Sequence, residues 1–190
     1  MRVFFVWHAE FRLYLYPEDP VFIADLVALR SLLSDLKFID KNLEKNRYST
    51  GDNFVSLLTF MGCSPNIELE PQEDKPFCYI EIDTTENPTF VFGKNTKSAV
   101  CIHCKKTLKN QTSSDILFKI RNVHVICSNC KETMESRKLN WRKSAFIASS
   151  WICIGNIYEM EAIPNDQLLT GLQKETGVIW KSAYVRANTN

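Results

Sequence analysis

Two pairs of cysteines are the residues in this chain best suited to chemistry. Cys101 and Cys104 form one C-x-x-C pair, and after twenty-two intervening residues Cys127 and Cys130 form a second. Two residues between cysteines let a tight turn direct both sulfurs at one ion, and the intervening stretch can form a hairpin that brings the two pairs together. The spacing therefore predicts a four-thiolate site for one zinc ion, with all four cysteines as ligands.

A zinc ion held by four thiolates has no open position for water or substrate, so such a site stabilises a fold and performs no reaction. Three other uses of four cysteines stay open: two disulfides, an iron–sulfur cluster, or a redox-active C-x-x-C pair. Disulfides need an oxidising compartment, and iron–sulfur spacings usually group three cysteines closely. A redox pair is expected at a helix start between strands. Structural zinc explains the spacing best.

Residues 98–134 resemble a zinc ribbon, a module built from two cysteine turns, called knuckles, and a small antiparallel sheet. The resemblance is confined to this stretch, and it implies the same four ligands and nothing further. The chain departs from the ribbon pattern at one point. Lys105 and Lys131 follow the two pairs where a glycine is usual, so the knuckle turns must accommodate side chains.

Charge is distributed very unevenly along the chain. Residues 94–143 carry twelve Lys or Arg against three acids, a net charge of +9, whereas residues 1–93 carry a net charge of −7. Clustered cations of this kind can bind a phosphate backbone by releasing condensed counterions. They can equally bind an acidic protein surface. The candidate nucleic-acid contacts are Lys105, Lys106, Lys109, Lys119, Arg121, Arg137, Lys138, Arg142 and Lys143.

Composition excludes several classes of protein. With 45% hydrophobic residues in 190, the chain can form a substantial core. It has six glycines and neither of the two glycine-rich phosphate-binding motifs, which argues against nucleotide hydrolysis. Only five apolar residues follow Arg2 before His8 interrupts, too few for a secretory signal, and no apolar run is long enough to span a membrane. We therefore expect a cytoplasmic protein with no membrane partner.

The hydrophobic pattern predicts an α+β fold, in which a mixed or antiparallel sheet packs with helices and carries an inserted four-cysteine zinc ribbon. We expect residues 1–97 and 144–190 to be two halves of one body, and residues 98–143 to be the inserted module with its basic return linker. The expected helices are 18–38, 54–61 and 165–177, the segment 40–52 is an exposed connection, and the expected strands are 3–16, 67–70, 77–82, 90–92, 145–157 and 178–186.

Other residues that could do chemistry have simpler structural explanations. His8 lies among apolar neighbours with no acid or nucleophile in evidence. Cys63 lies in a turn without an identifiable base, and Glu68 and Glu70 alternate with apolar residues as on a solvated strand edge. His103 and His124 flank the cysteines, but four thiolates already complete the coordination. We therefore predict no catalytic residue.

These observations favour a non-enzymatic zinc-binding protein whose basic module contacts another macromolecule, most readily a protein, as an adaptor, inhibitor or immunity protein does. The first alternative is a nucleic-acid-binding protein that uses the same cations. The second is an enzyme of unknown reaction that uses the α+β body, around Cys63 or Glu68 and Glu70.

Overall fold

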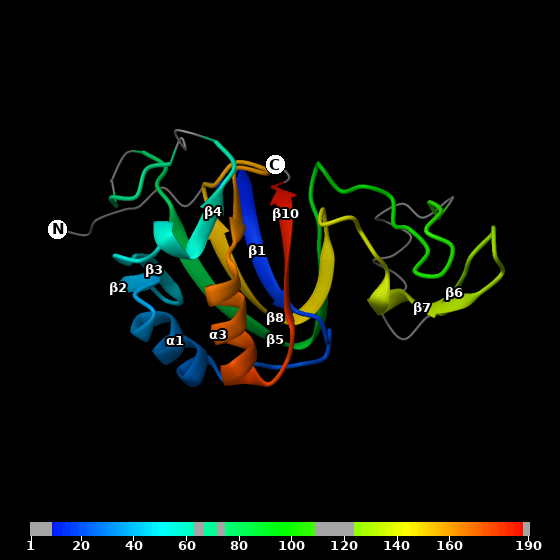
Figure 1. Cartoon of the computed structure of the whole chain (residues 1–190), viewed down its shortest axis with the longest axis horizontal. Helices are drawn as coiled ribbons and strands as arrows, with labels where there is room; N and C mark the ends of the chain where they lie inside the picture. The colour runs from blue at the N-terminus through cyan, green and yellow to red at the C-terminus, as the bar shows by residue number, and fades with distance from the viewer. Residues whose placement is uncertain (1–8, 63–66, 72–74, 109–123, 188–190) are drawn as a thin grey trace.

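The computed structural model describes residues 9–62, 67–71, 75–108 and 124–187. They form a six-stranded sheet in the order β10-β1-β8-β5-β3-β2, in which every neighbouring pair is antiparallel (Figure 1). The strands are β1 (Phe11–Pro17), β2 (Ile39–Glu44), β3 (Arg47–Thr50), β5 (Tyr79–Val91), β8 (Phe146–Gly155) and β10 (Trp180–Arg186). With two α-helices on this sheet, the α+β prediction is confirmed.

The helices α1 (Leu26–Asp35) and α3 (Asp166–Thr176) cover one face of the sheet. Side chains alternate along each strand, so Leu13 and Leu15 of β1 enter the core beneath the helices, as the sequence pattern indicated. They meet Leu29 of α1 and Leu168 of α3 there, and all four are almost completely buried. This is the main hydrophobic core of the protein.

The other face of the sheet is concave and has its own smaller core. Tyr14 of β1 packs there with Phe146 and Cys153 of β8 and Val185 of β10. The concavity comes from β5 and β8, which bend along their length (Figure 1). Their pairing is interrupted by a register shift between Thr84 and Thr89, a bulge of the kind that bends a strand.

The bend brings the end of β5 back toward β10. Lys94 N–H donates to the Arg186 carbonyl (2.9 Å), and the Asn95 side chain bonds the Tyr184 carbonyl (3.0 Å) and the Arg186 N–H (2.8 Å). A side chain at Gly93 would collide with that Arg186 carbonyl, so only glycine fits this approach. Lys94 and Asn95 are therefore fixed against the outer edge of β10. They protect that edge from pairing with another chain.

The first helix is shorter than predicted, because residues 18–25 lie outside it. The Ser150 hydroxyl accepts from Ala24 N–H (2.8 Å) and donates to the Phe22 carbonyl (3.0 Å), which leaves these backbone groups unavailable to a helix. Asp25 caps the actual start by accepting from Val27 and Ala28 N–H. The prediction that this helix begins at residue 18 was wrong.

Two further predictions were wrong in the segment that follows. Residues 40–52 were expected to be an exposed connection, but β2 and β3 form a hairpin there that adds two strands to the sheet. Residues 54–61 were expected to be a helix, yet they form one 3₁₀ turn (Val55–Leu57) followed by the short strand β4 (Leu58–Phe60). This strand pairs with β9 (Ala162–Pro164). Because its backbone hydrogen bonds go to β9, residues 58–60 do not form a helix.

The second helix follows its sequence signals closely. Asn165 caps the start by accepting from Leu168 N–H (3.0 Å), and Gly177 ends it in the left-handed conformation, at φ 74°. Among the described residues, no helix combines the length and apolar character that a membrane crossing would need.

Candidate metal centre

The four cysteines lie between β5 and β8, in two turns of the same design. The second knuckle joins β6 (His124–Ile126) to β7 (Thr133–Glu135), and Ile126 pairs with Thr133 across it. The first is flanked by a single bridge between Val100 and Thr107. Each turn therefore presents its two cysteines from the tip of a short antiparallel hairpin. The sequence predicted a hairpin in the stretch between the two pairs, and most of that stretch lies outside the described residues.

Hydrogen bonding within the two turns is equivalent. Lys105 N–H donates to the Cys101 carbonyl (3.0 Å) and Cys101 N–H donates to the Lys106 carbonyl (2.9 Å). In the second turn, Lys131 N–H donates to the Cys127 carbonyl (2.9 Å), and Cys127 N–H donates to the Glu132 carbonyl (2.9 Å). These bonds close each loop around its cysteine pair, so the sulfur positions are fixed by the backbone.

Lys105 and Lys131 occupy the position that needs a left-handed backbone, with φ angles of 60° and 64°. A residue with a Cβ is strained in this conformation, which is why glycine is usual there. Lys105 offsets part of the strain because its ammonium donates to the Ile102 carbonyl of its own turn (2.6 Å). The departure that the sequence showed is therefore accommodated without a change in the shape of the turn.

The sulfur atoms are arranged to hold one metal ion such as zinc. All four lie within 4.8 Å of one another, and the Cys101–Cys130 and Cys104–Cys127 sulfurs are each 3.7 Å apart. In a regular tetrahedron with metal–sulfur bonds of about 2.3 Å, sulfur atoms are about 3.8 Å apart. The contacts cross between the two turns, so an ion at the centre would join them. All four are free thiols, which does not support the two-disulfide alternative.

Backbone N–H groups favour the charged form of at least one ligand. The N–H groups of Cys130 and Asn129 are directed at the Cys127 sulfur and lower the pKa of this thiol to about 6. In the first turn, Cys104 N–H points at the Cys101 sulfur in the same way (3.5 Å). A thiolate is the form that binds metal, so these donors prepare the site for a cation.

The module that carries the cysteines is packed firmly on the sheet. Trp141 is almost completely buried and lies against Phe90 of β5, with their ring centroids 5.0 Å apart. Ile147 of β8 completes the contact, and the same apolar cluster includes Cys101 and Cys127. The metal ligands thus share one core with two strands of the body, and the module is an extension of the sheet.

Hydrogen bonds also join the two segments that enter and leave the module. Val100 N–H donates to the Asn140 carbonyl (2.8 Å), Lys97 N–H donates to the Ser144 hydroxyl (2.9 Å), and the Arg142 guanidinium donates to the Ser98 carbonyl (2.9 Å). The return segment was expected to be a linker or a cationic helix. Residues 131–144 instead contain β7 and one 3₁₀ turn (Ser136–Lys138), and a bridge between Asn140 and Val100 joins them to the segment that enters the module. We call the entering and returning segments, 97–100 and 140–144, the stem of the module.

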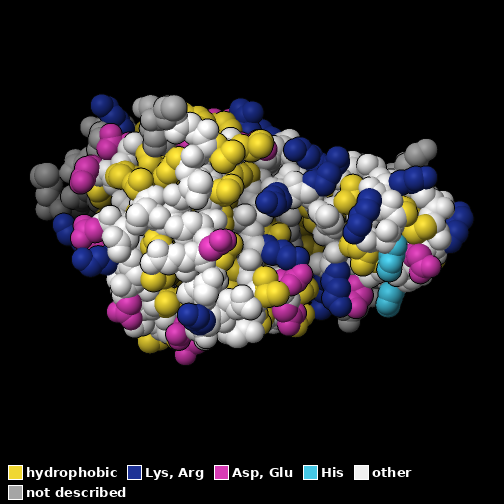
Figure 2. Space-filling view, in the orientation of Figure 1, with side chains coloured by type: hydrophobic (Ala, Val, Ile, Leu, Met, Phe, Trp, Pro, Cys, Tyr) yellow, Lys and Arg dark blue, Asp and Glu magenta, His cyan; other side chains and the backbone are white. Residues whose placement is uncertain are grey.

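Of the nine predicted nucleic-acid contacts, six lie in described residues and all of these are on the module or its stem. Lys105, Lys106, Lys138, Arg142 and Lys143 are exposed and Arg137 is half-buried. Figure 2 shows Lys and Arg side chains gathered over the region that joins the sheet to the module. Lys109, Lys119 and Arg121 lie outside the described residues.

The residues set aside during sequence analysis are in part described. His103 and His124 are exposed, and so are Glu68 and Glu70, while Ile67 and Leu69 between them pack on the main core. This alternation was predicted for a strand edge, but residues 67–70 form no strand, so the strand expected there was wrong. His8 and Cys63 lie outside the described residues.

Sequence reasoning missed the residues that anchor the module. Phe90 and Ile147 were assigned only to strands, and Trp141 was placed in a basic linker. A signal was present, because Trp141 is the one large aromatic residue in the basic run 131–144, and a tryptophan in such a run needs an apolar surface to cover it.

Comparisons of the chain with models of known protein families, with curated proteins and with solved structures gave no match.

Proposed function

We propose that the four thiolates bind one zinc ion, and that this ion is structural and makes the module a zinc ribbon. The support is the tetrahedral spacing of the sulfurs and their origin in two equivalent knuckles. An iron–sulfur cluster would hold its sulfurs farther apart than a single ion does. Four protein ligands leave no position for a substrate, so the zinc contributes folding free energy.

We further propose that the protein is a non-enzymatic binding protein whose cationic module contacts an acidic surface of a partner protein. The observation that carries this proposal is a set of exposed module cations with no ion-pair partner among the described carboxylates: Lys105, Lys106, Lys131, Arg142 and Lys143. Some body cations are paired within the body, as in Arg47–Glu81 (2.6 Å) and Lys181–Glu18 (2.5 Å), while others such as Arg30 and Lys41 are exposed without an ion pair. The module differs because five unpaired cations occur in its two knuckles and its return segment, so among the described residues it offers a concentration of positive charge that no carboxylate neutralises.

A protein partner suits this surface better than a single-stranded nucleic acid. Bases are usually held by stacking on exposed aromatic rings. Trp141 of the module and Phe90, the residue of β5 on which it packs, are both buried in the shared core. Ile126 of β6, next to the second cysteine pair, is 66% exposed, and an exposed apolar side chain beside charged residues is typical of a protein contact.

A phosphate backbone is the second candidate, because it needs cations but no aromatic platform. The exposed cations favour it as they favour an acidic protein, and the predicted contacts from Lys105 to Lys143 would serve. A salt titration helps to distinguish the two ligands. Affinity for duplex DNA falls with rising salt concentration, and it falls more steeply the more phosphates the protein neutralises.

The test compares a polyglutamate chain with a DNA duplex as ligands of the zinc-loaded protein over a range of salt concentrations. A variant with Lys106→Glu, Lys131→Glu and Lys143→Glu removes cations that make no ion pair among described residues. A control variant, with Arg30→Glu, Lys41→Glu and Lys174→Glu, makes the same charge change at exposed positions of the body.

We expect the module variant to lose polyglutamate binding while the control variant keeps it. Duplex binding that is the tighter of the two at every salt concentration, and that only the module variant loses, would replace the protein-binding proposal with the second candidate. Equal loss in both triple variants would contradict both proposals, because it would assign binding to net charge alone.

A further inference from the structure

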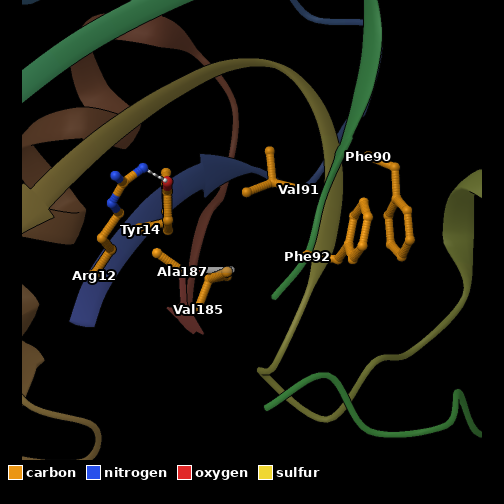
Figure 3. Close-up of a pocket in the computed structure, with 7 residues that line it drawn as sticks. All are labelled: Arg12, Tyr14, Phe90, Val91, Phe92, Val185 and Ala187. Atoms are coloured by element: carbon orange, nitrogen blue, oxygen red, sulfur yellow. Dashed lines mark hydrogen bonds between the residues drawn. The ribbon is translucent and has the colours of Figure 1, made fainter. Parts of the chain in front are cut away.

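A pocket of about 330 Å³ opens on the concave side of the sheet, away from the cysteines. Figure 3 shows its two walls. Arg12 and Tyr14 of β1 line one side together with Val185 and Ala187 from the end of β10. Residues 90–92 at the end of β5 line the other side. The volume lies at the small end of the range of ligand pockets, about 300 to 1,000 Å³, so it suits one small molecule.

The one charged group in this lining is Arg12. Its Nε donates to the Ala9 carbonyl (3.2 Å), and one of its terminal nitrogens donates to the Tyr14 hydroxyl (3.4 Å). Among the described residues no carboxylate pairs with it, and the nearby Glu10 is already bound by Arg186. A guanidinium has five N–H groups in a planar fork. Several therefore stay available on a half-buried cation that has no counter-charge within the described part of the chain.

The two walls are held apart at a fixed spacing. The bonds from Lys94 and Asn95 to Tyr184 and Arg186 tie the end of β5 to β10, directly beside the pocket. On the opposite wall, the bonds to Ala9 and Tyr14 hold the guanidinium in place. A ligand would therefore meet a preformed site, which reduces the ordering that binding requires.

We propose that this pocket binds a small organic carboxylate with a flat apolar body, such as an aromatic acid. The single guanidinium matches the single charge and planar fork of a carboxylate. A phosphate would bring up to two charges and needs more cations than the lining supplies. Phe92, Val91 and Val185 offer an apolar surface for the rest of the molecule. The lining includes Phe90, which also packs against Trp141 of the module, but none of the cations proposed for partner binding, so this proposal stands whether or not the module binds a partner.

The test titrates benzoate into the zinc-loaded, full-length protein and follows the Arg12 side-chain N–H and the Val185 and Ala187 amide signals by NMR. Benzamide, which has the same shape without the charge, and inorganic phosphate are titrated in parallel. The variants are Arg12→Gln, which removes the charge, and Ala187→Leu, which fills the pocket but leaves Arg12 in place. Arg30→Gln, at an exposed site on α1, is the control for loss of one cation.

We expect saturable benzoate binding with a Kd on the order of 1 mM or tighter. Arg12→Gln and Ala187→Leu should each weaken it about tenfold or more, while Arg30→Gln leaves it unchanged. Because Arg12→Gln could disturb the sheet, unchanged amide signals of Leu29 and Leu168, in the main core on the other face, serve as its folding check. Ala187→Leu tests the pocket independently. No saturable binding, equal binding of benzamide, equal binding of phosphate, or unchanged binding in both pocket variants would each overturn the proposal.

Discussion

Replacing Lys131 by glycine should strengthen zinc binding. Lys131 has a φ of 64°, and its exposed side chain makes no ion pair among the described residues. The left-handed conformation costs about 1–2 kcal/mol for a residue with a Cβ. Glycine relieves this cost but gives back about 0.5–1 kcal/mol, because a flexible residue loses more freedom on folding. The difference is a stabilisation of about 0.5–1 kcal/mol.

Because binding and folding are coupled in a small zinc module, this free energy should appear in the zinc affinity. We expect Lys131→Gly to bind zinc roughly two- to fivefold more tightly, as measured by competition with a chelator of known affinity. Lys131→Ala removes the same charge but keeps the strain, so its affinity should stay close to that of the parent protein. Lys106→Gly places a glycine beside the other knuckle, at a residue without positive φ, and should bind more weakly.

The reasoning would be refuted if Lys131→Gly and Lys131→Ala changed the affinity equally, since the effect would then come from charge. It would also fail if Lys131→Gly bound zinc more weakly than the parent, because the turn would not have the left-handed backbone described above.

Three further predictions concern the module, the sheet and pH. Trp141→Ala should lower the free energy of unfolding by about 3–5 kcal/mol and speed amide exchange in the module first. Equal acceleration in the strands that pack on α1 would contradict an apolar cluster around Trp141 that is distinct from the main core. Gly93→Ala should lower the thermal midpoint, because the added Cβ meets the Arg186 carbonyl, whereas Gly62→Ala, with open space around its Cβ, should not; equal midpoints would argue against the β5–β10 closure. The backbone N–H groups that lower the pKa of Cys127 favour its thiolate, and a lowered pKa gives stability that is lost as the pH falls; because all four cysteines must be deprotonated to bind zinc, a zinc-responsive dye should report release on acidification, and zinc that stays bound in strong acid would contradict thiolate ligation.

The sequence predicted best those elements that local chemistry decides. The helix α3 has a cap at Asn165 and a stop at Gly177, and it lies where these signals placed it. The strand expected at 3–16 includes most of β1, where side chains alternate so that Leu13 and Leu15 enter the main core and Tyr14 lies on the opposite face. In these segments propensity, capping and hydrophobic period agree, so no long-range contact needs to override them.

The failures lie where long-range contacts decide the structure. Residues 22–24 have a helical pattern, but Ser150, more than 120 positions away, binds their backbone. The hairpin of β2 and β3 has few buried apolar residues, because it forms the edge of the sheet, and Ile39 and Tyr48 are the exceptions. Two separate strands, 77–82 and 90–92, were expected where the structure has the single strand β5. This strand contains Pro88, and the register shift at that point accommodates a residue without an N–H.

The candidate metal centre was more predictable than its setting. Four cysteines at this spacing have few geometric solutions, and the structure brings their sulfurs together. The expected boundaries of an inserted module, 98 and 143, stay a prediction. The contact of Trp141 with Phe90 depends on how β5 bends, and that bend depends on pairing with β8, which no local pattern encodes. The pocket at Arg12 arises from the same bend.

The most direct test of the central claim is the zinc content of the purified protein, measured together with its amide NMR spectrum before and after chelation. We predict one zinc ion per chain. Chelation should collapse the signals of residues 98–108 and 124–143, because the knuckles lose the ion that joins them, and zinc should restore these signals. A protein without bound metal, or a module whose signals are unchanged after the metal is removed, would contradict the account.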